Sequence, residues 1–161
     1  MLLAQSRHET ALGKEWMSVK ISQLHLSDFM LFQQADFQWS PGINVICGTN
    51  STGKTALIKL MYSLHKSYEQ WNSTETKEAA VNSFSEKLCG VFRPDNGKVG
   101  RLVRRKQGNA QMTASMGYEN GTSIDVNFGN RASKIATLAL PKMEHTASPD
   151  HTAVYFPPKE I

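Results

Sequence analysis

One short motif constrains this chain more than any other feature of its sequence. Residues 48–55 read Gly-Thr-Asn-Ser-Thr-Gly-Lys-Thr and match the pattern G-x-x-x-x-G-K-[ST] at every fixed position. The β-branched, mostly apolar run over residues 43–47 precedes the motif and predicts a buried strand. Behind the motif, apolar residues recur at intervals of three and four, as in an amphipathic helix. A strand, a glycine loop and a helix in this order make the cradle that a bound phosphate group requires.

Each motif position has its own role in such a cradle. Glycines permit backbone angles and a close approach of phosphate that a Cβ would block. The loop amides can converge on phosphate oxygens, and the following helix directs its positive end at them. A lysine brings a mobile charge to the β- and γ-phosphates, and a threonine hydroxyl serves Mg²⁺. The predicted residues for ATP are Gly48, Asn50, Ser51, Thr52, Gly53, Lys54 and Thr55, with Thr55 also the Mg²⁺ ligand. A glycine-rich turn that matches the pattern by chance is the alternative.

The rest of the chain predicts several strands and one further helix. Strands are expected over residues 19–26, with one slip of phase, and over residues 35–39. Apolar spacing over residues 81–88 predicts a helix that Gly90 stops.

A hairpin is the clearest prediction in the second half of the chain. Residues 112–118 and 124–128 alternate between apolar and polar on either side of Asn120-Gly121, which indicates two strands joined by a two-residue turn. Further strands are expected over residues 135–140 and 153–156.

Length, composition and cysteine usage set the outer limits. The chain has 161 residues, about one domain, and no apolar run long enough to span a membrane as a helix. Two cysteines cannot build a disulfide framework, so a reducing, cytoplasmic setting is expected. The net charge of +4 permits a nucleic-acid partner without requiring one. Residues 1–16 are expected to form a flexible N-terminal arm, and residues 17–161 a P-loop nucleotide-binding domain.

Several segments resemble the opening of ABC-type AAA ATPases, a group that includes chromosome-maintenance, DNA-repair and overcoming-lysogenization-defect proteins. The resemblance rests on residues 24–29, 37–46 and the phosphate loop, and extends more loosely over residues 87–94, 100–103 and 154–160. It implies an α/β P-loop NTPase fold, with a mixed sheet around the loop and an antiparallel β subdomain over about residues 101–140. It also implies Mg²⁺-dependent ATP binding.

Two elements of that family's active site are missing from this sequence. No run of four apolar residues leads into Asp-Glu, as a Walker B element would, and there is no Ser-Gly-Gly signature. In the family both lie downstream of the point where this chain stops, so the resemblance implies the N-terminal half of an ABC-type head. We therefore expect ATP binding without ATPase-like turnover, and pairing with a second copy or with a separate C-terminal half. Glu160, behind two prolines, is the one weak catalytic candidate.

Two other functions stay open at this stage. A P-loop small-molecule kinase would need an acidic base and a lid arginine, and the β-rich second half argues against it. A non-hydrolysing, nucleotide-dependent assembly module would act by dimerising.

The sequence contains three smaller features. Two of them have both a functional and a structural interpretation, and the third has a structural interpretation alone. The cluster Arg101, Arg104, Arg105 and Lys106 would contact nucleic acid or protect a solvated strand edge. The group Phe29, Met30 and Phe32 would meet an adenine ring, as the resemblance implies, or pack in the core. Cys47, at the end of the predicted buried strand, is expected to be an inert packed thiol.

Overall fold

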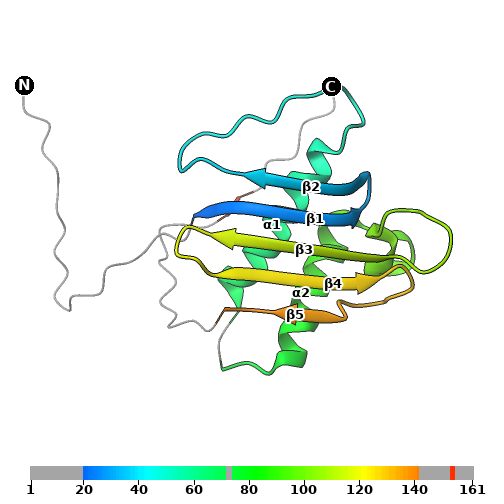
Figure 1. The fold of residues 1–161 in the computed structure, drawn as a ribbon. Helices are drawn as coiled ribbons and strands as arrows, with labels where there is room; N and C mark the ends of the chain where they lie inside the picture. Colours follow the sequence, from blue (N-terminus) through cyan, green and yellow to red (C-terminus); the bar gives the residue numbers. More distant parts are fainter. Residues whose placement is uncertain (1–19, 72–73, 142–152, 155–161) are drawn as a thin grey trace, which may run out of the picture.

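In the part of the chain that the structure describes, five strands form one sheet, and two helices lie across one of its faces (Figure 1). The computed structural model describes residues 20–71, 74–141 and 153–154. The order across the sheet is β2-β1-β3-β4-β5, and every pairing is antiparallel. The strands are β1 (Ile21–Phe29), β2 (Phe32–Gln38), β3 (Gln111–Tyr118), β4 (Ser123–Gly129) and β5 (Thr137–Ala139). The helices are α1 (Lys54–Gln70) and α2 (Lys77–Phe92), with short 3-10 turns η1 (Asp95–Gly97) and η2 (Val99–Leu102).

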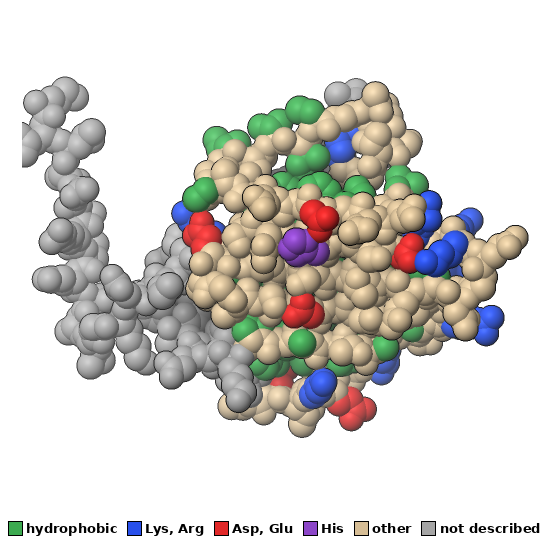
Figure 2. All heavy atoms as spheres, viewed as in Figure 1, with side chains coloured by type: hydrophobic (Ala, Val, Ile, Leu, Met, Phe, Trp, Pro, Cys, Tyr) green, Lys and Arg blue, Asp and Glu red, His purple; other side chains and the backbone are tan. Residues whose placement is uncertain are grey.

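Alternation along the central strands divides the sheet into an apolar and a polar face. Every second residue of β3 and β4 is buried, and the helices cover this side. The other side stays open to solvent, and His25 Nδ1 there donates a hydrogen bond of 2.5 Å to Asp36 Oδ1. Figure 2 looks onto this open face, where a His side chain with acidic side chains on either side lies at the centre among other polar groups, and Lys and Arg lie toward the rim. The core therefore lies between the sheet and the two helices.

The predicted helices are confirmed with one correction. Helix α1 begins at Lys54, directly behind the glycine loop, and buries Leu57, Leu60 and Leu64. Gly90 does not stop α2, which continues to Phe92 before Arg93 takes a left-handed conformation. Because Pro94 disfavours a helical residue before it, the helix ends there rather than at the glycine.

The predicted slip of phase and the hairpin are both present. The slip is a register shift between Ile21 and Gln23 in the pairing of β1 with β3. The hairpin joins β3 and β4, but its turn has three residues instead of two. Gly121 N–H donates to Tyr118 O at 3.0 Å, and Tyr118 N–H donates to Thr122 O at 2.9 Å. Only Gly121, at φ +80°, is left-handed, so the loop is a type I turn closed by a glycine bulge.

The expected mixed sheet with a separate β subdomain over residues 101–140 is wrong for the described residues. Strand β3 pairs directly with β1, so the N-terminal and later strands belong to one antiparallel sheet. The resemblance implied the subdomain, and the alternation of the later strands does not say which strand lies beside them.

The predicted buried strand over residues 43–47 is also absent. Ile43 is 93% and Val45 78% exposed, and no described strand pairs with this segment. Cys47 is exposed rather than packed. An apolar run of this kind is buried only when neighbours cover it on both faces, and the described residues provide no such cover.

Some predictions lie outside the described residues: the arm over 1–16, residues 155 and 156 of the strand predicted over 153–156, and Glu160. Of that strand, Ala153 and Val154 are described and are not in a strand. Within the described part of the chain, no helix is both long and apolar enough to cross a membrane.

Candidate phosphate-binding loop

The motif residues form a loop that ends where helix α1 begins. Ser51 and Gly53 are left-handed, at φ +64° and +91°. The first bond of the helix runs from Leu57 N–H to Gly53 O at 2.9 Å, so the three amides before Leu57 have no intrahelical partner. The loop therefore presents unpaired backbone donors at the positive end of a helix.

Lys54 is folded back over this loop. Its ammonium Nζ donates to Gly48 O at 2.7 Å and to Thr49 O at 2.5 Å, and lies 3.4 Å from Thr52 Oγ1. All three partners are neutral, and the first turn of α1 contains no acidic residue. The positive charge of Lys54 thus adds to that of the helix end and is not cancelled by a neighbouring carboxylate in that turn.

Of the two glycines in the loop, Gly53 is the one at which a side chain is less tolerable. A Cβ there would lie 2.8 Å from Cζ and 2.9 Å from Cε2 of Phe32, and the φ of +91° disfavours any L side chain. Thr55 is exposed at the start of α1. Amides, an ammonium group and an exposed hydroxyl at one loop are the donor set that a triphosphate with Mg²⁺ requires.

The aromatic group before the loop separates into two roles. Phe29 is fully buried and packs edge-on against Phe92, with ring centroids 5.8 Å apart, so it is a core residue. Met30 is 38% exposed at the turn between β1 and β2. Phe32 lies against the phosphate loop, with its ring edge beside the backbone of Gly53.

The basic cluster lies in a loop rather than on a strand edge. Arg101 belongs to η2, and the other three residues lie between η2 and β3. Lys106 forms an ion pair of 2.5 Å with Asp28, and Arg104 N–H donates to Asp28 O at 2.7 Å. The cluster does not lie on one of the five strands, but an isolated antiparallel bridge between Val103 and Phe29 joins this segment to the end of β1. Of its four charges, Lys106 is paired within the chain.

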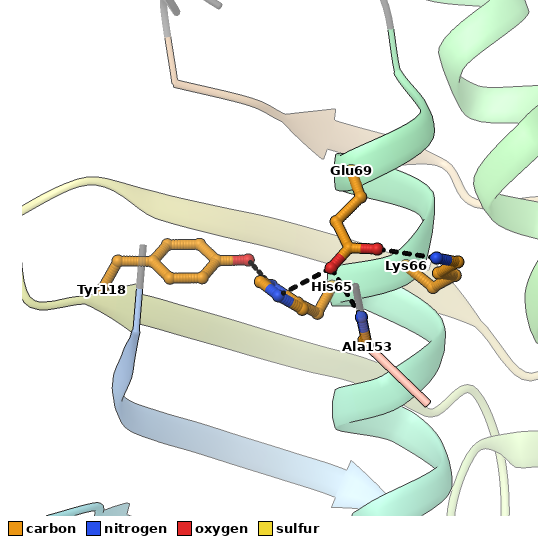
Figure 3. Close-up of polar contacts among 5 residues, drawn as sticks. All are labelled: His65, Lys66, Glu69, Tyr118 and Ala153. Carbon is orange, nitrogen blue, oxygen red and sulfur yellow. Dashed lines mark hydrogen bonds and ion pairs between the residues drawn. The ribbon is translucent and has the colours of Figure 1, made fainter. Parts of the chain in front are cut away.

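A polar network at the far end of α1 was missed by sequence reasoning (Figure 3). Tyr118 OH lies 3.0 Å from His65 Nδ1, and His65 Nε2 lies 3.3 Å from Glu69 Oε1. Lys66 Nζ donates to Glu69 Oε2 at 2.8 Å, and Ala153 N–H donates to Glu69 Oε1 at 2.8 Å. The i, i+3 and i, i+4 spacings within α1 are visible in the sequence. The contacts with Tyr118 and Ala153 depend on the fold.

Burial governs the protonation states in this network. It lowers the pKa of His65, against the opposing charge of Glu69, so the ring is neutral at pH 7. Burial also raises the pKa of Tyr118, so its hydroxyl keeps the proton that it donates to His65 Nδ1. For Glu69, burial works to raise the pKa, but hydrogen bonds from Lys66 and Ala153 and the nearby charges outweigh it and lower the pKa overall.

A groove of about 520 Å³ runs between helix α1 and the segment that leads to the loop. Its lining is largely apolar and includes Trp39, Ile46, Ile58, Met61 and Val154. Trp39 Nε1 is buried and has no acceptor among the described residues. Ile58 and Val154 are exposed here, as are Ile43 and Val45 on the neighbouring segment.

Comparison with known proteins decides the family. The family described as "AAA domain" matches residues 23–137, which include the loop, both helices and most of the sheet. The chain belongs to this AAA domain family. The resemblance to ABC-type AAA ATPases is thereby confirmed, and the α/β fold agrees with it.

The curated relatives are bacterial proteins named "DNA replication and repair protein RecF". The protein of Limosilactobacillus reuteri (strain DSM 20016) is 34% identical over 77 residues, 44% of this chain and 21% of the relative. That of Streptococcus equi subsp. zooepidemicus (strain MGCS10565) is 27% identical over 99 residues, 54% of this chain and 27% of the relative. That of Renibacterium salmoninarum is 46% identical over 41 residues, 26% of this chain and 10% of the relative. The matches thus span about a quarter of these relatives or less. No solved structure matches the chain.

Proposed function

We propose that this chain binds MgATP through residues 48–55, as part of an ABC-type ATPase of the DNA-repair kind. The observation that carries the proposal is the loop itself, in which Lys54 and the unpaired amides at the start of α1 meet around left-handed Gly53. The name shared by its relatives, DNA replication and repair protein, supports the biological setting.

Different residues of the loop would hold different parts of a triphosphate and its Mg²⁺. The amides at the start of α1 would bind phosphate oxygens, and Lys54 would exchange its contacts with Gly48 O and Thr49 O for the β- and γ-phosphates. The exposed hydroxyl of Thr55 would hold Mg²⁺. When bound, Mg²⁺ supplies neutralisation of phosphate charge.

Binding without rapid turnover is part of the same proposal. Transfer of the γ-phosphoryl group to water needs a positioned nucleophile as well as a charge clamp. The loop provides the clamp, but no apolar run of this sequence ends in Asp-Glu, and no signature motif is present. Hydrolysis would then require residues from a partner, with Glu160 as the candidate within this chain.

The apolar groove supports a partner chain. Ile43 and Val45 are exposed, and the segment that carries them lines the apolar groove beside α1 through Ile46, so an additional strand would cover apolar side chains here. The buried and unpaired Trp39 Nε1 would find an acceptor in such a strand. We propose that a second copy or a separate C-terminal half supplies it, which also keeps the nucleotide-dependent assembly module open as an alternative.

A small-molecule kinase receives no support from the fold. Kinases of that kind alternate strands and helices around a parallel sheet, whereas the described strands are all antiparallel. We further propose a cytoplasmic setting, which agrees with two free cysteines, Cys47 and Cys89.

Calorimetric titration of ATP with Mg²⁺ tests the proposal. Lys54→Ala should abolish binding without changing the melting temperature, since its side chain contacts the loop rather than the core. Lys87→Ala, on helix α2, makes the same charge change as a matched control. Equal affinity of wild type and Lys54→Ala would refute the phosphate site.

A further inference from the structure

Phe32 lies against the hinge of the phosphate loop. Three atoms along one edge of its ring, Cδ2, Cε2 and Cζ, lie 3.8, 2.9 and 2.8 Å from the position that a Cβ on Gly53 would occupy. Gly53 has no Cβ, so this edge fills the space beside its backbone.

The ring is held from behind by the main body of the fold. Phe32 pairs with Phe29 across the turn between β1 and β2, and Phe29 is fully buried. Two backbone bonds tie this turn to the η2 segment: Met30 N–H to Leu102 O at 2.8 Å, and Arg104 N–H to Asp28 O at 2.7 Å. The turn that carries Phe32 is therefore anchored to the core.

The ring is also held from the side. Phe37 meets it edge-on, with centroids 6.1 Å apart and an interplanar angle of 86°. Phe37 in turn stacks on Trp39, at 5.7 Å and 15°. Aromatic pairs in these geometries attract each other beyond their buried area, so Phe32 has little freedom to move away from Gly53.

Gly53 determines how the loop meets the helix. It is the N-cap of α1, at φ +91°, and its carbonyl accepts the first helical hydrogen bond. A small rotation at this residue would change the direction of the amides that precede the helix. A glycine is also the residue whose backbone is least restrained by its own side chain, so restraint has to come from a neighbour.

We infer that Phe32 is a positioning residue for the phosphate loop, and that it braces Gly53 instead of providing a platform for the nucleotide base. The inference rests on the proposed function, because it assigns Phe32 to the phosphate part of that site. It makes a clear distinction between ligands: a brace affects every ligand that carries the phosphates, whereas a platform affects only those with a base.

The test compares ATP with inorganic tripolyphosphate, both with Mg²⁺, on wild type, Phe32→Ala and Phe32→Leu. Phe32→Ala should weaken both ligands by a similar factor of about tenfold, equivalent to about 1.4 kcal/mol. Phe32→Leu should recover part of the loss for both, because it refills part of the space beside Gly53. Leu31→Ala is the matched control, an apolar and 61% exposed neighbour in the same turn, and should leave tripolyphosphate binding unchanged.

Two results would overturn the inference: loss of affinity for ATP alone, which would make Phe32 a base platform, or no loss for either ligand. A second readout needs no ligand. The ¹⁵N order parameter of Gly53 should fall in Phe32→Ala from the value of rigid backbone toward that of a flexible loop. An unchanged order parameter would contradict the brace even if wild type bound neither ligand, a result that would refute the proposed function separately.

Discussion

Glu69 accepts a hydrogen bond of 2.8 Å from the backbone N–H of Ala153, across 84 positions of sequence. The same carboxylate accepts from Lys66 and faces His65, which reaches Tyr118 at the end of β3. Helix α1 therefore carries the phosphate loop at its first turn and a junction between three parts of the chain at its last. The junction is partly buried around buried Tyr118, and its members are hydrogen-bonded to one another, which makes it sensitive to the loss of any one of them.

The first prediction concerns Glu69. Its lowered pKa means that the folded state favours the carboxylate, so the stability it contributes is present above its ordinary pKa of 4.5 and is lost as the pH falls below that value. Glu69→Gln should lower the free energy of unfolding at pH 7 by about 1–3 kcal/mol, the range for hydrogen bonds to charged groups. Urea unfolding at several pH values measures this. A wild-type and variant difference that persists unchanged at pH 3 would contradict it.

The second prediction concerns His65, which should affect the pH dependence of stability in a higher pH range than Glu69 does. Because its pKa is lowered from 6.5, the unfolded state binds a proton first, and stability should fall as the pH drops below 6.5 and level off below the folded pKa. His65→Gln should flatten the profile of melting temperature against pH in this range while leaving the steeper part below pH 4.5 in place. An unchanged slope between pH 6.5 and 5 would show that His65 is protonated without cost in the fold.

Two glycines offer a paired prediction of opposite sign. At both Gly121 and Gly90 a Cβ would meet nothing within 4 Å, but only Gly121 has a positive φ, of +80°. Gly121→Ala should therefore destabilise the fold by about 1–2 kcal/mol, the cost of a left-handed L residue. Gly90→Ala lies inside α2 and should stabilise it by about 0.5–1 kcal/mol. Thermal unfolding of the two variants measures both, and a shift in the same direction would disprove the assignment of at least one.

These results show which parts of the structure local patterns predict. The start of α1 and the hairpin of β3 and β4 follow from period and turn residues, which act over a few positions. The structure of residues 43–47 does not follow from such a pattern, because their apolar side chains indicate burial but not which part of the structure covers them. The contact between His65 and Tyr118 joins residues that are 53 positions apart, so no local pattern of the sequence predicts it. In the site, the motif predicted the loop residues, whereas the role of Phe32 depends on a turn whose position only the fold determines.

Thr55 is the next residue to test within the motif. If its hydroxyl holds Mg²⁺, Thr55→Ala should raise the Mg²⁺ concentration needed for half-maximal ATP binding while Mg²⁺-free binding changes little. Thr55→Ser keeps the hydroxyl and should behave as wild type. Equal Mg²⁺ dependence in the alanine variant and wild type would remove Thr55 from the metal site.

The last prediction concerns the exposed apolar surface beside the loop. Ile43 and Val45 lie in a β-branched run with which no described strand pairs, on the segment that lines the groove along α1, and such a surface favours association with another strand. We expect sedimentation velocity to show concentration-dependent association of the chain. The double variant Ile43→Thr and Val45→Thr should weaken it by at least about tenfold, because burying one large aliphatic side chain contributes about 1.5–3 kcal/mol. Leu31→Thr, an exposed apolar residue on the turn beside Phe32, is the control and should not change the association. A chain that stays monomeric at all concentrations, or a double variant that associates like wild type, would show that this surface is not the contact.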